Sequence, residues 1–231
     1  MRLLAFDTST ELLSVAVRHG DMLIERESAG GAQASATLIP LIQGLLEEAG
    51  LSLRELDAIA FGRGPGSFTG LRTACSVAQG LGFGAGVALL PVDTLLAVAE
   101  EARHRFGAHR LVAVLDARME QVYAASYDFA SGAAPQVEPQ LLAPEELVVP
   151  PGYVLAGNAF EAYGDRLPAA PARHSARPTA AAMLRLAPGL LTKGASVPPA
   201  DAWPLYVRDK VAQTTAERAA AKQQLSDSSS S

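Results

Sequence analysis

The segment from Gly62 to Gly70, with the sequence GRGPGSFTG, combines glycines and hydroxyl side chains where an apolar run gives way to a helical pattern. Glycines permit positive φ and close backbone approach, and the N–H groups that open a helix attract anions. Gly64, Gly66 and Ser67 are therefore candidate phosphate contacts. The loop lacks the Gly-Lys-Ser/Thr of a Walker loop and does not complete GxGxxG. Its spacing favours the alternative, a tight structural turn or a loop that faces another protein.

A second polar cluster, Asp7, Thr8 and Ser9, follows the first apolar run of the chain. A carboxylate beside hydroxyls could contact phosphate or a metal-bound water in a phosphotransfer enzyme. The alternative is structural, because Asp side chains in turns accept hydrogen bonds from nearby backbone N–H groups. These three residues complete the candidate nucleotide-contacting set, and the structural alternative is favoured for them.

Metal and thiol chemistry find little support in the sequence. The four histidines are His19, His104, His109 and His174, and no HxxxH or HExxH spacing occurs. Zinc and iron sites need several His, Cys or carboxylate ligands at suitable spacing. The single cysteine, Cys75, lies in a small-residue apolar stretch and is predicted to be a buried hydrophobe. We expect no catalytic residue and no metal ligand in this chain.

Composition restricts the class of protein. Hydrophobic residues make up 49% of the 231 and charged residues 19%, and the net charge is −5. An acidic chain whose 19 basic residues form no run is a poor nucleic-acid binder by itself, because such binding depends on neutralising phosphates. If it acts on RNA, a partner is expected to carry most of the contact. Asp7 interrupts the first apolar run too early for a signal peptide, and no stretch reaches membrane-spanning length, so we expect the cytoplasm and no membrane contact.

Hydrophobic periodicity predicts the elements that position these residues. Strands are predicted at residues 3–6, 13–17, 22–26, 57–61, 89–92, 111–115, 122–127 and 153–156. Helices are predicted at residues 37–49, 67–83, 94–106 and 179–191, with Thr94 as the cap of the third, and residues 205–208 are a last extended piece. The candidate phosphate loop therefore opens the second helix, and the Asp7 cluster forms a turn between strands.

Two distant segments share one pattern. LLAFDTSTELLSVAV and VAVLDARMEQVYAAS each contain an apolar strand, an Asp, three residues, a Glu and another strand, so that Asp7 matches Asp116 and Glu11 matches Glu120. An internal repeat indicates a duplicated unit. A duplicated unit of strand, acidic turn and hairpin is what a two-lobed, actin-like α/β fold requires, and we predict that fold. The predicted division is an N-terminal, partner-binding lobe at 1–108, a C-terminal lobe at 109–210 and a disordered tail at 211–231.

The second predicted helix is rich in small residues: Gly70, Ala74 and Ala78 recur at a spacing of four, and Gly80 and Gly84 follow. Glycine inside a helix costs about 1 kcal/mol relative to alanine, so close approach of another helix should offset that cost, either within the domain or from a partner. The partner interpretation is our hypothesis. Its candidate interface residues are Leu38, Leu41, Ile42, Leu45, Gly70, Ala74, Val77, Ala78 and Leu81.

Four segments are similar, in the same order, to motifs of the bacterial TsaB (YeaZ) family. They are LLAFDTST (3–10), GRGPGSFTGLR (62–72), LDARMEQVYAA (115–125) and PLYVR (204–208), and the resemblance covers roughly residues 1–210. It implies an actin-like fold of the sugar-kinase/Hsp70 type with duplicated lobes. It also implies membership in the machinery that attaches threonylcarbamoyl to N6 of the adenosine beside the anticodon in certain tRNAs.

The same resemblance implies the partners. In that machinery a TsaD-type protein is the catalytic subunit and pairs with the N-terminal lobe of TsaB, a TsaE-type ATPase joins the pair, and tRNA is reached through the complex. TsaD binds metal through paired histidines on an N-lobe helix, whereas the matching stretch here, residues 33–46, contains no histidine. The resemblance thus implies a non-catalytic scaffold subunit, able to form a homodimer when alone. It implies no tightly bound cofactor, with ATP or ADP expected only at the complex interface.

Two rival hypotheses stay open. An ATP-dependent phosphotransferase or hydrolase of the actin-like superfamily would use Asp7 as a base or metal anchor and the loop 62–70 on phosphate. The chain is short for such kinases, and Gly157-Asn158 is the best remnant of a second phosphate loop. The weaker rival is a homodimeric binding module.

Overall fold

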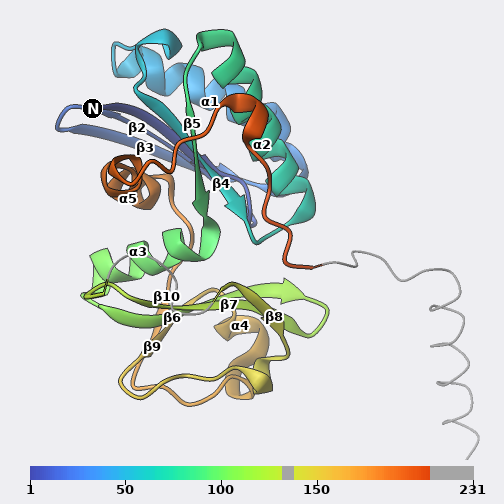
Figure 1. The fold of residues 1–231 in the computed structure, drawn as a ribbon. Helices are drawn as coiled ribbons and strands as arrows, with labels where there is room; N and C mark the ends of the chain where they lie inside the picture. Colours follow the sequence, from blue (N-terminus) through green and yellow to red (C-terminus); the bar gives the residue numbers. More distant parts are fainter. Residues whose placement is uncertain (132–137, 209–231) are drawn as a thin grey trace, which may run out of the picture.

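The first of two β-sheets has the strand order β3-β2-β1-β4-β5 in the computed structural model, which describes residues 1–131 and 138–208 (Figure 1). Its strands are β1 (Arg2–Asp7), β2 (Leu12–His19), β3 (Met22–Ala29), β4 (Ala58–Gly64) and β5 (Leu89–Asp93). The first three form an antiparallel meander, and β4 and β5 continue the sheet in parallel with β1. The meander matches the tight turns after Asp7 and at Gly20, and the parallel strands need the helical crossovers between them.

The second sheet repeats this topology, with the order β10-β9-β6-β7-β8. Its strands are β6 (Arg110–Arg118), β7 (Gln121–Asp128), β8 (Gln140–Leu142), β9 (Val154–Gly157) and β10 (Arg173–Ser175). Again three antiparallel strands are followed by two parallel ones. Asp7 and Asp116 occupy matching places near the ends of β1 and β6, opposite Ser14 and Val122. The duplicated two-lobed, actin-like α/β fold predicted from the repeat is confirmed.

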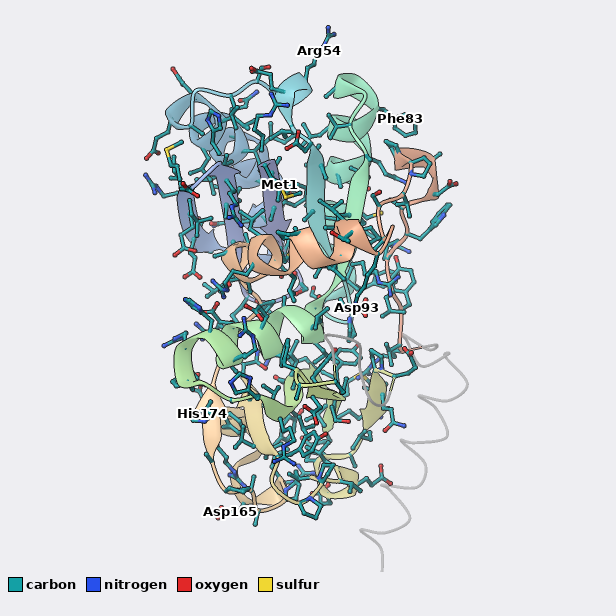
Figure 2. All side chains as sticks on the ribbon, turned by 60° about the vertical axis from the view of Figure 1, so that its left-hand side comes forward. Met1, Arg54, Phe83, Asp93, Asp165 and His174 are labelled. Carbon is teal, nitrogen blue, oxygen red and sulfur yellow. The ribbon has the colours of Figure 1, made fainter. Side chains whose placement is uncertain are left out.

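Helices and sheets alternate in layers (Figures 1 and 2). The helices are α1 (Ala34–Glu48), α2 (Phe68–Ala85), α3 (Thr94–Phe106), α4 (Phe160–Tyr163) and α5 (Ala180–Thr192). α1 and α2 cover the outer face of the first sheet, where they share a core with Phe6, Val15 and Ile59. α3 and α5 lie between the two sheets in one continuous core, and α4 packs on the far face of the second sheet.

The predicted boundary at residue 108 separates the strands of the two sheets but not their helices. α5 follows every strand of the second sheet, yet it packs on β1, β2 and β4 of the first sheet. α3 precedes that boundary and packs on β6, β7 and β9 of the second sheet. After α5 the chain returns to the first lobe, where Val197 pairs with Leu89 of β5. Periodicity predicts which face of a helix is buried but not which sheet covers it, so the contiguous division was wrong for these segments. The predicted tail at 211–231 lies outside the described residues.

The long elements lie where periodicity predicts them, and the differences concern short ones. β8 and β10, with 3 residues each, and α4, with 4, were not predicted, because so few residues carry no periodic signal. Thr94 is the first residue of α3 and follows the N-cap Asp93, so it does not cap the helix as predicted. Thr179 does cap α5, accepting a hydrogen bond from the N–H of Ala182 at 3.0 Å. Within the described residues, no helix combines the length and the apolarity needed to cross a membrane.

Candidate functional site

A cavity of about 420 Å³ lies between the two lobes. The first lobe contributes the turn after β1 and the loop before α2, and the second lobe contributes the turn between β6 and β7. The extended segment 205–208 completes the lining. The main lining residues are Ser9, Thr10, Glu11, Pro65, Gly66, Ser67, Phe68, Asp116, Arg118, Met119, Asn158, Tyr206 and Arg208. The duplicated fold therefore brings both acidic turns and the glycine-rich loop to one place.

The glycine-rich loop packs directly on the turn after β1. The N–H of Ser67 donates to the carbonyl oxygen of Ser9 at 2.8 Å, and the Thr8 hydroxyl donates to the carbonyl oxygen of Gly70 at 2.6 Å. A Cβ at position 66 would lie 2.6 Å from the Ser9 carbonyl oxygen, and one at position 70 would overlap the Thr8 carbonyl. These glycines are thus needed for close backbone contact within the lobe, which is the structural alternative weighed for this loop.

Gly64 must also be a glycine, because of its backbone conformation and its contact with Leu205. Its φ is 122°, and a Cβ there would lie 2.5 Å from the carbonyl oxygen of Leu205. The N–H of Leu205 donates to the Arg63 carbonyl oxygen at 2.6 Å. The end of β4 is therefore occupied by the C-terminal extended segment of the same chain.

Asp7 is buried behind the cavity instead of facing it. Its side chain is 1% exposed, and Oδ1 accepts hydrogen bonds from the N–H and the hydroxyl of Ser9 at 2.8 and 2.6 Å. Oδ2 has no partner among the described residues and lies against the Cα of Gly62. Burial raises the pKa of Asp7 to about 6, although the hydrogen bonds from Ser9 act in the opposite direction.

The candidate nucleotide-contacting residues are only partly brought together. Ser9, Gly66 and Ser67 line the cavity, whereas Asp7, Thr8 and Gly64 are not part of its lining. The rival hypothesis of an ATP-dependent enzyme would place ATP and magnesium in this cavity. The residues here do not fit that group, because Ser67 N–H is bonded to Ser9 and the Asp7 carboxyl lies behind the lining.

The part of the cavity lining that comes from the second lobe, around Asp116, was not predicted as part of a site. Asp116 accepts from the Arg118 N–H at 2.7 Å and from the Tyr163 hydroxyl at 2.8 Å, and its own N–H donates to Oδ1 of Asn158 at 2.9 Å. Arg118, Met119 and Glu120 all have positive φ, between 53° and 61°. The repeat had matched Asp116 to Asp7, and that match was the signal that could have placed this turn in the cavity.

Segment 205–208 carries the other residues that sequence reasoning missed. The Tyr206 ring lies 5.2 Å from the Phe68 ring, and its hydroxyl accepts from Arg72 Nε at 3.2 Å. Arg72 also lies over the Phe68 ring, with Cζ 3.7 Å from its centroid. Arg208 donates to the Ala117 carbonyl oxygen at 3.0 Å. The segment thus contacts both lobes along one edge of the cavity.

The predicted partner-interface residues are mostly inside the first lobe. Leu38, Ile42, Leu45, Ala74 and Ala78 are at most 2% exposed, and Gly70 is buried against Thr8. Leu41, Val77 and Leu81 are partly exposed. Packing within the domain accounts for the six buried positions, because the apolar face that periodicity detects on α1 and α2 covers their own sheet. The interface prediction therefore stays a prediction for the three partly exposed residues.

Cys75 is buried in α2, and its thiol donates to the Ala202 carbonyl oxygen at 3.4 Å. Burial raises the pKa of this thiol, which disfavours the reactive thiolate. No group of three or more His, Cys, Asp or Glu side chains suited to a metal ion occurs in the described ranges. His174 instead stacks on Phe106, and His19 contacts the Ala49 carbonyl oxygen at 3.1 Å.

Comparison with known proteins gives matches of three kinds. A family model described as TsaD, tRNA N6-adenosine threonylcarbamoyltransferase, matches residues 29–168. The "tRNA threonylcarbamoyladenosine biosynthesis protein TsaB" of Escherichia coli is 41% identical over 127 residues, covering 55% of each chain. Its Haemophilus influenzae counterpart is 42% identical over 123 residues, covering 53% of this chain and 52% of the relative. The chain thus spans about half the length of the curated relatives it matches.

The solved structure titled "YeaZ from Pseudomonas aeruginosa" superimposes with a TM-score of 0.83 and 37% sequence identity, covering 89% of this chain and 99% of that one. The shared fold therefore extends through both lobes. Because the family model matches more than half of the sequence and this likeness covers nearly the whole of the solved chain, the protein belongs to the TsaB (YeaZ) family.

Proposed function

We propose that this chain is a non-catalytic scaffold subunit of the complex that forms threonylcarbamoyladenosine in tRNA. In this proposal it binds a TsaD-type catalytic subunit in the cytoplasm through α1 and α2, a TsaE-type ATPase joins the pair, and tRNA is modified by the catalytic partner. The names of its relatives support the pathway. The surface of α2 supports the scaffold role.

The proposal rests on three glycines in α1 and α2 whose lack of a side chain is not required by packing within this chain. A Cβ at Gly80 or Gly84 of α2, or at Gly44 of α1, would meet no atom within 4 Å. Each of these glycines is exposed inside a helix, where it costs about 1 kcal/mol relative to alanine. By contrast, Gly70 and Gly82 are held against neighbouring atoms of the same lobe. Close approach of a partner helix would offset the cost at the three open positions.

The open glycines lie in a surface suited to a helix. On α2, Thr73, Val77, Gly80 and Gly84 follow a helical spacing and are exposed or partly exposed. On neighbouring α1, Leu41 and Gly44 are accessible in the same way. Phe83 is 63% exposed and projects from the end of α2 (Figure 2). The small residues would let a partner helix approach closely, and the exposed aromatic ring beside them would give it apolar contact area. The same surface could serve a homodimer when the chain is alone.

The proposal assigns no tightly bound cofactor to this chain and places ATP or ADP, where needed, at the interface of the assembled complex. The rival, an ATP-dependent phosphotransferase, needs an accessible carboxylate and free N–H groups at the glycine-rich loop. Burial of Asp7 and the bond between Ser67 and Ser9 argue against it. Titration calorimetry of the purified chain with ATP and magnesium separates the two, since binding with turnover would favour the enzyme.

The test of the scaffold role is Gly80→Arg, with Gly189→Arg as its matched control. Gly189 is likewise an exposed glycine inside a helix with open space at its Cβ, but it lies on α5. Both changes should leave the isolated chain folded and equally or more stable, because arginine is the better helix former. We expect Gly80→Arg to abolish co-purification with the cognate TsaD-type subunit and Gly189→Arg to preserve it. Full-strength pairing by Gly80→Arg would reject the proposed interface.

A further inference from the structure

Three side chains form a row across the second sheet, on the face that looks toward the first lobe. Leu115 of β6 lies opposite Tyr123 of β7, and both belong to the core between the two sheets. Asn158 follows β9, two residues after Ala156 of the same core. The neighbouring strands β9, β6 and β7 thus bring Asn158, Leu115 and Tyr123 to one place, where all three line the cavity between the lobes.

The hydroxyl of Tyr123 has no partner. Tyr123 is only 7% exposed, yet its hydroxyl makes no hydrogen bond with any described residue. The enclosed side-chain oxygens that lack a partner in residues 1–131 and 138–208 belong to Asp7, Thr94 and Tyr127. The Tyr123 hydroxyl is not enclosed in this way, so the space that it reaches is the cavity that the residue lines. It is therefore free to bond a molecule bound there.

Asn158 offers further donors on the other side of Leu115. Its Oδ1 accepts a hydrogen bond from the Asp116 N–H at 2.9 Å, which fixes the orientation of the amide. Its Nδ2 group bonds to no described residue and is likewise not enclosed. Tyr123 and Asn158 lie two strands apart, a backbone separation of about 10 Å. A molecule that spans them needs hydrogen-bond acceptors at two points and an apolar part between.

The charges of the lining leave one cation without a counter-charge. Asp116 pairs with Arg118 at 3.0 Å, and Glu11 lies 3.3 Å from Arg177. Arg208 donates to backbone carbonyl oxygens but forms no ion pair with the described residues. The first turn of α2 also begins in the lining and contains no acidic residue, so it adds positive potential. These features favour a ligand that carries a negative group.

The rest of the lining is mostly apolar. Pro65 and Leu71 come from the first lobe, Leu115 from the second, and Leu205 and Val207 from the C-terminal segment. The volume of about 420 Å³ lies within the range of small-molecule sites, about 300–1,000 Å³. Apolar walls with a few converging polar groups are the usual composition of such sites.

We propose that this cavity binds a small organic carboxylate that has an apolar body and a second hydrogen-bond acceptor. Its acceptor oxygens bond the Tyr123 hydroxyl and the Asn158 amide, and its negative charge lies in the positive potential of Arg208 and α2. Its apolar body packs between Leu71 and Leu115. The ligand thereby contacts both lobes.

Other classes of ligand fit less well. A purely apolar molecule would leave the Tyr123 hydroxyl and the Asn158 amide without partners, which costs free energy. A divalent cation would need free carboxylates, and both acidic side chains of the lining are paired. A polyphosphate would need several unpaired cations, and among the described lining residues Arg208 alone is unpaired. The site does not depend on the scaffold role, which concerns α1 and α2.

The test measures binding of N-acetylleucine and of 4-oxo-4-phenylbutanoate to the purified full chain by ligand-detected NMR. Each acid is compared with its uncharged amide. We expect at least one acid to bind with a Kd below about 10 mM and its amide to bind about tenfold more weakly. Tyr123→Phe should weaken binding of that acid by about five- to tenfold, as expected for one lost hydrogen bond.

Two further variants sharpen the test. Asn158→Asp keeps an acceptor for the Asp116 N–H but replaces the free donors with a negative oxygen, so it should weaken binding of the acid by more than about tenfold. Tyr153→Phe is the matched control, because Tyr153 packs on the far face of the second sheet and is not part of the cavity lining. It should leave the Kd unchanged.

Several results would overturn the site. They are no binding of either acid at about 10 mM, equal binding of acid and amide, or equal Kd values for the parent and Tyr123→Phe. Displacement of the acid by an equal concentration of inorganic phosphate would also overturn it, because the cavity would then be a simple anion site. Co-purification with the TsaD-type subunit is measured separately. Loss of pairing would reject the scaffold role and leave the carboxylate site standing.

Discussion

Nη2 of Arg208 donates a hydrogen bond to the carbonyl oxygen of Ala117 at 3.0 Å, and this bond joins the C-terminal segment to the turn of the second lobe. Two residues earlier, Tyr206 is bonded to Arg72 on α2 of the first lobe. The segment between them therefore ties the lobes together along one edge of the cavity.

Arg208→Ala should loosen this tie. Hydrogen bonds to charged groups are worth roughly 1.5–3 kcal/mol, so we expect the free energy of unfolding to fall by about 2 kcal/mol. The backbone amide of Leu205, bonded to the Arg63 carbonyl oxygen, should exchange its hydrogen faster. Hydrogen exchange followed by mass spectrometry measures the effect. Arg54→Ala, at an exposed residue of the first lobe, should leave the exchange at Leu205 unchanged.

Asp7→Asn should change how stability depends on pH. The pKa of Asp7 is raised from 3.8 to about 6 in the folded chain, so the folded state binds the proton more tightly than the unfolded state. The contribution of Asp7 therefore falls as pH rises from about 4 to 6, by about 3 kcal/mol in total. Asn cannot ionise, so the stability of the variant relative to the parent should increase across this window. Urea unfolding at several pH values measures it.

Asp57→Asn is the control of opposite sign. The backbone N–H of Arg2 donates to the Asp57 carboxylate at 2.7 Å and lowers the pKa of Asp57. Its stabilising contribution is therefore present at neutral pH and is lost as pH falls through the folded pKa. Asp57→Asn should destabilise the chain at pH 7 and have little effect in acid. Parallel pH profiles for the two variants would contradict the assignment of the Asp7 effect to burial.

Gly70→Ala and Gly80→Ala should have opposite effects on the isolated chain, although both glycines belong to α2. A Cβ at position 70 would overlap the carbonyl of Thr8, so the turn after β1 must shift and we expect a loss of roughly 2–3 kcal/mol. Gly80 has open space, and alanine there should add up to about 1 kcal/mol through helix propensity. Chemical denaturation of both variants measures the two signs. A loss at position 80 would show that this glycine is needed within the chain.

Glu100→Ala should destabilise the layer between the two sheets. The Glu100 carboxylate is 2% exposed and pairs with Arg103 at 2.7 Å and with Arg185 of α5 at 3.1 Å. Removing it leaves two partly buried guanidinium groups with fewer partners, which costs about 3 kcal/mol by analogy with other broken buried pairs. Thermal unfolding measures the loss. Glu47→Ala, on the exposed face of α1, should change the melting temperature little.

The sequence determined the local structure and the duplication. Alternating apolar residues predicted β2, helical spacing predicted α1 and α2, and the match of Asp7 to Asp116 predicted two related sheets. These features could be predicted from the sequence because they depend on residues nearby in the chain or on direct repetition. The four motifs likewise pointed to the family before any fold was known.

Only the tertiary structure decided which surfaces the helices cover and which groups meet. In the folded chain α3 packs on the second sheet and α5 on the first. Leu38 and Ala78 are buried inside the first lobe, whereas a Cβ at Gly80 would meet open space. The fold also buries Asp7 behind the cavity and stacks the Phe106 ring on His174. Hydrophobic periodicity records that one face of a helix is buried, but the atoms that bury it come from distant parts of the chain, and only three-dimensional packing selects them.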